Sequence, residues 1–205
     1  MNAIIPRFEF RTFAQDLVRV QECLAALSHG ETVRENREVY LLRPKEWHRN
    51  IKIRGGRLEL KELIEQRQGL QRWTPAGQWA FPIGSDAIQA SIFPGWRFAR
   101  QQPGPENFSK SLLLEELVGD GSGLLRANVF KRRMIHSIDG GSAELDDILV
   151  NGALIRSVAV ESEDADTVVA ARQALGLAGH ENISYPLAIA RIMGREPLPD
   201  EDSYG

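Results

Sequence analysis

The sequence contains a single cysteine, Cys23, among its 205 residues. One thiol can form neither an internal disulfide nor a cysteine zinc site, and such sparse use of cysteine fits a reducing cytoplasm. The sequence also lacks any apolar run of about 20 residues, the length that a membrane-spanning helix needs. Residues 1–6 show no basic region followed by an apolar stretch. We therefore expect a cytoplasmic protein with neither a secretion signal nor a membrane segment.

The chain has no large excess of charge, because 25 lysines and arginines are matched by 28 aspartates and glutamates, with a formal net charge of −3 at pH 7. This balance gives no general attraction to nucleic acid or to anionic membranes, and neither is expected as a partner. Any anion site must be a local concentration of lysine and arginine. The sequence has no P-loop and no G-x-S-x-G motif, and its four histidines have no partners at metal-ligand spacing. Sites of those kinds are therefore not expected.

Charged residues occupy alternate positions in several predicted strands. The pattern is found in the segments 7–11 (RFEFR), 51–54 (IKIR) and 58–61 (LELK), and again in the pairs Lys131 with Arg133 and Glu144 with Asp146. Successive side chains of a strand point to opposite faces, so these segments predict a sheet with one apolar face and one face of mixed charge. A solvated outer face is the ordinary explanation. Helical segments are nevertheless available to cover the apolar face, and we expect the charges to point inward, into a polar barrel or cleft.

Two turns bring the charges of neighbouring strands to one face. The pair 55–56, Gly-Gly, suits a two-residue hairpin turn with positive φ, which would place Lys52 opposite Glu59. The pair 151–152, Asn-Gly, is a second strong hairpin signal. With that pair at the turn centre, one face of the flanking strands carries the three carboxylates of Glu144, Asp146 and Glu161.

The remaining periodicity predicts helices beside the strands. Apolar residues recur at spacings of three and four over residues 13–27, and further helices are expected at 111–118, 164–177 and 184–193.

The other segments divide into strands and irregular regions. Residues 37–42 are expected to form a strand, and a meander of three strands is expected from residue 124 onward. Residues 74–110 are rich in proline, glycine and tryptophan and show little periodicity, so no element is predicted there. The glycine-rich segment 119–123 matches a nucleotide-binding loop incompletely, and we interpret it as a turn.

The order of these motifs resembles that of the CYTH family, the triphosphate tunnel metalloenzymes. The motifs are, in chain order, the charged first strand, Ile51–Arg54, Leu58–Lys61, Lys131-x-Arg133, Leu145-Asp146, Val160-Glu161 before a helix, and a closing helix at Ser184-Tyr185. The resemblance covers nearly the whole chain apart from residues 74–124. It implies an α+β fold in which an eight-stranded antiparallel β-barrel forms a tunnel with helices packed outside, and in which residues 1–205 are one CYTH-like domain. Family members include inorganic triphosphatases, thiamine triphosphatases and class IV adenylyl cyclases.

The resemblance also implies a set of site residues. Those expected to bind phosphate are Arg11, Lys52, Arg54, Lys61, Lys131 and Arg133. Those expected to hold Mg²⁺ or Mn²⁺ are Glu9, Glu144, Asp146 and Glu161. Lys61 and Glu161 would act in catalysis. The chemistry agrees, because a triphosphate carries several negative charges that basic donors and a divalent cation with oxygen ligands would offset.

The chain departs from the family pattern in two strands. The first strand of the family usually reads E-x-E-x-K, whereas here Arg7 stands in place of the first glutamate and Arg11 in place of the lysine. The last strand usually reads E-x-E, but here Ala159 precedes Glu161. Two expected carboxylates are therefore missing. Three functions stay open: a metal-dependent triphosphatase acting on a phosphorylated small molecule, a non-catalytic polyanion-binding tunnel, and a protein-interaction module that retains the fold.

Overall fold

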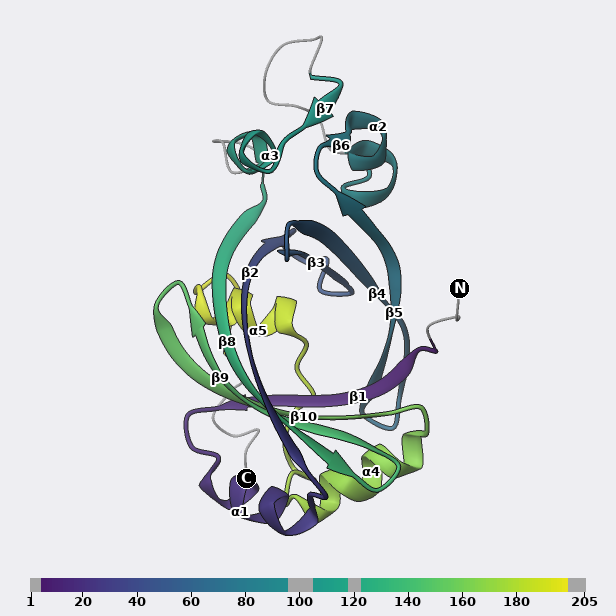
Figure 1. The fold of residues 1–205 in the computed structure, drawn as a ribbon, viewed down its shortest axis with the longest axis vertical. Helices are drawn as coiled ribbons and strands as arrows, with labels where there is room; N and C mark the ends of the chain where they lie inside the picture. The colour runs from purple at the N-terminus through teal and green to yellow at the C-terminus, as the bar shows by residue number, and fades with distance from the viewer. Residues whose placement is uncertain (1–4, 96–104, 118–122, 199–205) are drawn as a thin grey trace.

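A computed structural model describes residues 5–95, 105–117 and 123–198. Its centre is a closed antiparallel barrel of eight strands in the order β1-β10-β9-β8-β2-β3-β4-β5 (Figure 1). The strands are β1 Arg7–Ala14, β2 Glu31–Leu42, β3 Arg49–Arg54, β4 Arg57–Arg67, β5 Leu70–Ala80, β8 Leu125–Ile138, β9 Gly141–Val150 and β10 Ala153–Ser162. A separate two-stranded sheet consists of β6 Ile83–Gly84 and β7 Asn107–Phe108. The eight-stranded barrel expected from the sequence is confirmed.

Helices cover the outside of the barrel at two places. They are α1 Val18–Leu27 with α4 Ala165–Ala174 at one place, and α2 Ser85–Ala87, the π-helix η1 Ile88–Ile92 and α3 Lys110–Leu117 at the other. The last helix is α5 Tyr185–Ile192. Figure 1 shows α1 and α4 below the barrel in this view, and α2 and α3 above it. In the described part of the chain, no helix has the length and apolar character needed to cross a membrane.

The outward faces of the strands are apolar, and the helices bury them. Phe10 and Val160, on the neighbouring strands β1 and β10, belong to one buried cluster with Leu24 of α1 and Val168 of α4. A second cluster joins the outward residues of β3 and β4 to η1 and α3. Because apolar side chains lie outside under helices, the alternate charged positions of the same strands face the interior. The α+β fold and the inward orientation expected from the sequence are both confirmed.

The last helix, α5, packs on an apolar part of the barrel interior. Tyr185 and Ile189 share a buried cluster with inward residues of three strands, including Tyr40, Val129 and Ile148. Figure 1 shows α5 within the outline of the barrel. One part of the interior is therefore filled with apolar side chains, and the charged part lies beside it.

The turn-based registers are also confirmed. Lys52 pairs with Glu59 across the Gly55–Gly56 turn. Asn151 and Gly152, both with positive φ, centre the β9–β10 hairpin. The register predicted from that second turn is therefore the observed one, with Glu144 opposite Ala159 and Ser142 opposite Glu161.

Some boundaries differ from the sequence predictions. Phe13 lies in β1, and the helix begins only at Val18, because the strand continues its pairing with β10 to Ala14. The strand expected from residue 37 begins at Glu31, because it pairs along its whole length with β8.

Strand β5 and the two short strands β6 and β7 were not predicted. The segment 74–80 belongs to β5, which pairs with β4 although it contains Pro75. The register shift between Leu60 and Lys61 lies opposite that proline, so a bulge accommodates the residue that cannot donate a ladder hydrogen bond. The predicted helix at 111–118 corresponds to α3, while Val118 and residues 119–122 of the glycine-rich segment lie outside the described residues.

Candidate functional site

A cavity of about 100 Å³ lies inside the barrel. All the site residues implied by the sequence line it except Asp146, which is fully buried and accepts a hydrogen bond from Arg11. The lining residues are Glu9, Arg11, Glu38, Tyr40, Asn50, Lys52, Arg54, Lys61, Trp73, Lys131, Arg133, Glu144, Glu161, Ser184 and Tyr185. The barrel thus brings together residues that are far apart in the sequence, such as Glu9 and Glu161.

Strand alternation and register place these side chains. The charged residues come from inward positions of β1, β2, β3, β4, β8, β9 and β10. Glu9 and Glu161 are direct register partners, so their carboxyl groups lie side by side. Lys61 faces inward by its alternation with Leu60, and it lies beside the register shift at which Ala76 of β5 has no partner in β4.

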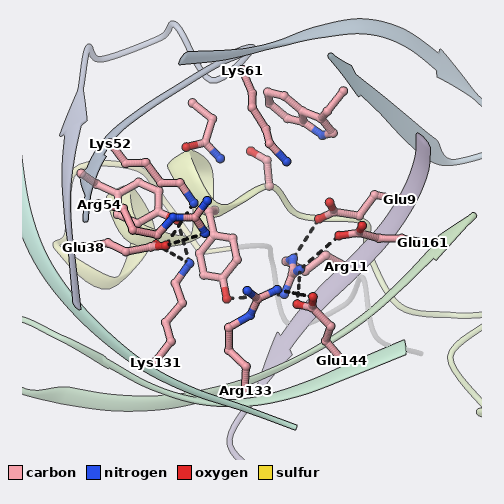
Figure 2. Close-up of a pocket in the computed structure, with 15 residues that line it drawn as sticks. Glu9, Arg11, Glu38, Lys52, Arg54, Lys61, Lys131, Arg133, Glu144 and Glu161 are labelled. Carbon is pink, nitrogen blue, oxygen red and sulfur yellow. Dashed lines mark hydrogen bonds and ion pairs between the residues drawn. The ribbon is translucent and has the colours of Figure 1, made fainter. Parts of the chain in front are cut away.

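One side of the cavity is built around Arg11. Four carboxylates, which we name the acidic cluster, surround its guanidinium: Glu9, Glu144, Asp146 and Glu161. Figure 2 shows three of them, Glu9, Glu144 and Glu161, around Arg11. The distances from guanidinium nitrogen to carboxylate oxygen are 2.8 Å to Glu9, 3.3 Å to Glu144, 3.2 Å to Asp146 and 4.0 Å to Glu161. Arg133 forms a further ion pair with Glu144. The acidic cluster is therefore compensated by arginine.

Glu161 is the least well compensated member of the acidic cluster. Burial, together with the neighbouring carboxylates of Glu9 and Glu144, raises the pKa of Glu161 to about 7. The ordinary value is 4.5. Between the two pKa values, the carboxyl group keeps its proton in the folded state and loses it in the unfolded state. The free energy of unfolding therefore decreases as pH rises through this range.

This raised pKa gives a sign to the pH dependence of stability. We expect wild-type protein to lose stability between pH 4.5 and about 7, the window between the two pKa values of Glu161. Glu161→Gln cannot ionise, and it should therefore be more stable than wild type at pH 8, by an amount on the order of 2 kcal/mol. The two proteins should have similar stability at pH 4. Urea unfolding at the two pH values measures the difference, and an equal gap at both would contradict the assignment.

The other side of the cavity is built around Glu38. Its side chain is only 2% exposed. Three cations, which we name the basic cluster, surround it: Lys131 at 2.8 Å, Lys52 at 3.1 Å and Arg54 at 3.5 Å. Burial acts to raise the pKa of Glu38, but Lys131 and Lys52 outweigh it and hold that pKa far below its usual range. Glu38 is thus an ionised carboxylate that neutralises the basic cluster from within.

Lys131 is the most deeply buried member of the basic cluster. Its ammonium donates a hydrogen bond to the Tyr40 hydroxyl at 2.8 Å and lies 3.5 Å from the centre of the Tyr185 ring. Burial lowers the pKa of Lys131 to about 7 even though Glu38 opposes the shift. The Glu38 carboxylate and the rings of Tyr40 and Tyr185 offset part of the cost of burying this charge.

Lys61 is different from the other cations of the cavity. Among the described residues it forms no ion pair, whereas each of the other five lining cations contacts a carboxylate. Its side chain is exposed, and Figure 2 shows it reaching into the space between the two clusters. Lys61 is therefore the cation whose charge is most available to a bound anion.

Glu38 is the charged residue that the sequence reasoning missed. Its neighbour Arg37 is also charged, so the segment shows no clean alternation. The signal was the register itself, because Glu38 pairs with Arg54 and Tyr40 pairs with Lys52 on the adjacent strand. A predicted pairing of 37–42 with 51–54 would have found it.

The acidic cluster does not fit a resident divalent metal. A metal would have to occupy the space between the four carboxylates, and the Arg11 guanidinium lies there. Over residues 5–95, 105–117 and 123–198, no group of three or more histidine, cysteine, aspartate or glutamate side chains is arranged to hold an ion. Within the acidic cluster, Glu144 is paired with Arg133, and Asp146 does not line the cavity. Glu9 and Glu161 are therefore the two members of the cluster whose carboxylates face the cavity without a contact to Arg133.

The structure is a closed antiparallel barrel of eight strands with charged side chains inside, which is the arrangement that the resemblance to the CYTH family implies. No protein-family model and no curated protein matches the chain. Among solved structures, it is similar to HpAC1 from Hippeastrum, described as an adenylyl cyclase candidate with a dominant triphosphatase activity, at 14% identity and a TM-score of 0.53, over 95% of this chain and 99% of that one. It is also similar to PH1012 from Pyrococcus horikoshii, at 15% identity and a TM-score of 0.49, over 89% and 97% of the two chains. At such identities the likeness establishes the fold alone.

Proposed function

We propose that the tunnel binds the triphosphate group of a small molecule. The observation that carries the proposal is the convergence of six cationic side chains on one cavity, with Lys61 left unpaired among the described residues. Charge-assisted hydrogen bonds from lysine and arginine are strong, and several of them are needed for a polyanion such as triphosphate. The triphosphatase activity attributed to HpAC1, which shares the fold, supports this ligand class.

The charge balance indicates the form in which such a ligand enters. Six cations line the cavity, but four carboxylates line it as well, and Glu59 and Asp146 form ion pairs with three of those cations, Arg11, Lys52 and Arg54. The tunnel is therefore close to neutral before a ligand binds. A triphosphate brought in as its Mg²⁺ or Mn²⁺ complex carries less charge, and two carboxylates suffice for a magnesium ion that is shared with phosphate. Glu9 and Glu161 are the two that we assign to that contact.

Hydrolysis of the bound triphosphate is a second candidate function, favoured by the position of Glu161 beside Glu9 at the cavity. Water would attack the terminal phosphorus, the bond from that phosphorus to the bridging oxygen would break, and the diphosphate part would leave with that oxygen while orthophosphate forms. In this scheme Lys61 would neutralise charge on the phosphoryl oxygens, Glu9 would keep the metal contact, and Glu161 would instead accept the proton from the water. The other possibility is that the tunnel holds the polyanion without turnover, as the missing carboxylates at positions 7 and 159 would allow.

A thermal-shift panel combined with a phosphate-release assay tests both functions. The ligands are tripolyphosphate, ATP, thiamine triphosphate and pyrophosphate, each with and without millimolar Mg²⁺ or Mn²⁺. A ligand at 100 times its Kd stabilises the folded protein by roughly 2.7 kcal/mol, which is visible in a domain of this size. We expect the metal complexes of the triphosphates to raise the melting temperature most. No shift with any ligand would contradict binding, and a shift without phosphate release would leave the non-catalytic function.

A further inference from the structure

We propose that Arg11 is a built-in cation that takes the place of a resident divalent ion, so that the tunnel acquires a divalent cation only together with a phosphate ligand. The first part concerns the protein alone. The second part rests on the proposed function, and separate measurements test the two.

The hydrogen bonds of Arg11 carry the first step of the inference. Its guanidinium has five N–H donors. Nε donates to Glu9, Nη2 donates to Glu144, and Nη1 lies within hydrogen-bond distance of Asp146, Ser157 and Tyr185. These partners come from β1, β9, β10 and α5, so the side chain is held on all sides, and it is 4% exposed. The N–H donors of Arg11 are therefore directed mainly at side chains of the protein, and few of them are available to a ligand.

An unsatisfied oxygen shows that the acidic cluster still demands positive charge. Asp146 is fully buried, and its Oδ1 has no hydrogen-bond partner, whereas Oδ2 accepts from Arg11 and from the Tyr185 hydroxyl. A buried carboxylate oxygen without a partner is costly. One guanidinium thus faces four carboxylates, one of which keeps an oxygen without a hydrogen-bond partner.

The neighbouring residue on β10 leaves the space that the guanidinium uses. Ala159 is the register partner of Arg11 and is fully buried. A longer carboxylate side chain at this position would compete with the guanidinium for the same volume. The small side chain at position 159 and the planar, forked guanidinium at position 11 therefore fit each other.

The test is Mn²⁺ binding to the full chain without any phosphate ligand, measured by electron paramagnetic resonance of the free ion. Arg11→Met keeps an apolar side chain of similar length and leaves the four carboxylates without their central cation. We expect this variant to bind Mn²⁺ at least about tenfold more tightly than wild type, because opposite charges interact strongly in a buried site. Arg57→Met removes an exposed cation that is not among the cavity-lining residues and should bind Mn²⁺ as wild type does.

Thermal unfolding gives a second readout that needs no activity. Arg11→Met should be destabilised without metal, and Mn²⁺ should raise its melting temperature while leaving that of wild type almost unchanged. Arg11→Lys retains a point charge without the fork, and we expect an intermediate affinity for Mn²⁺. If Arg11→Met does not fold even with Mn²⁺, the Mn²⁺ affinity of Arg11→Lys relative to wild type tests the role of Arg11. Affinity for Mn²⁺ no higher in the variants than in wild type would overturn the role of Arg11.

The order of binding is tested on wild type alone. We expect negligible Mn²⁺ binding to wild type without a ligand. When tripolyphosphate is added, we expect more Mn²⁺ to be bound than the same concentration of tripolyphosphate binds in the absence of protein. Tight binding of Mn²⁺ to wild type without phosphate would overturn the inference but not the proposed function. Absence of any effect of tripolyphosphate would contradict the proposed function and leave the Arg11 result standing.

Discussion

Replacing Glu38 by glutamine should lower the free energy of unfolding by about 3 kcal/mol at pH 7, because it removes one partner of a buried ion-pair network. Glu38 is 2% exposed and lies within 3.5 Å of three cations from β3 and β8. Without it, the buried charge of Lys131 would lose its ion pair, and Lys52 would keep only the more distant carboxylate of Glu59 at 4.0 Å. Lys131 can release its proton, which limits the cost, since burial already lowers its pKa to about 7. Chemical denaturation at constant pH measures the loss.

Two further variants separate this effect from a general loss of packing. The double change Glu38→Gln with Lys131→Met removes an anion and a cation together and should recover part of the stability. Glu62→Gln breaks the more exposed pair with Arg49 and should cost less than about 1 kcal/mol.

The pH dependence of the Glu38 effect follows from the depressed pKa of its carboxyl group. Its stabilising contribution is complete above the ordinary value of 4.5 and is lost as pH falls further. The gap between wild type and Glu38→Gln should therefore shrink below pH 4.5. A gap as large at pH 3 as at pH 7 would show that the ion pairs are not its cause.

Replacing Lys61 by methionine should weaken the binding of tripolyphosphate by about 1.5–3 kcal/mol, the contribution of a hydrogen bond to a charged group. This corresponds to a loss of affinity of roughly tenfold to more than a hundredfold. The effect should exceed that of Lys131→Met, because Lys131 is already neutralised by Glu38, while Lys61 forms no ion pair among the described residues. Isothermal titration calorimetry gives the affinities.

The matched control is Lys110→Met, which removes an exposed lysine at the start of α3, outside the tunnel. It should leave the affinity for tripolyphosphate unchanged. Equal losses in the Lys61 and Lys110 variants would indicate general electrostatic attraction in place of a defined site.

Much of the fold could be predicted because strand alternation and two glycine turns are local signals. Gly55–Gly56 and Asn151–Gly152 set the registers of two hairpins, and a register decides which side chains share a face. With the apolar faces covered by helices, the charges must point inward. This is why the amino-acid sequence alone suffices to group the basic residues of β3 with one another and the carboxylates of β9 with Glu161 of β10.

The rest depended on contacts between strands that are distant in sequence. Strand β5 escaped prediction because Pro75 and Gly77 interrupt the alternation, although its pairing with β4 outweighs their poor strand propensity. Glu38 escaped because its partners lie on two other strands. The position of Arg11 between four carboxylates could not be predicted either, since those carboxylates come from three strands that meet only in the closed barrel.

The central claim, that the tunnel is a site for triphosphate, is tested most directly by calorimetric titration of tripolyphosphate with Mg²⁺ into wild type and into Lys61→Met. We expect saturable binding of one ligand per chain to wild type, and binding at least about tenfold weaker to the variant. No saturable binding to wild type, or the same affinity in both proteins, would contradict the claim.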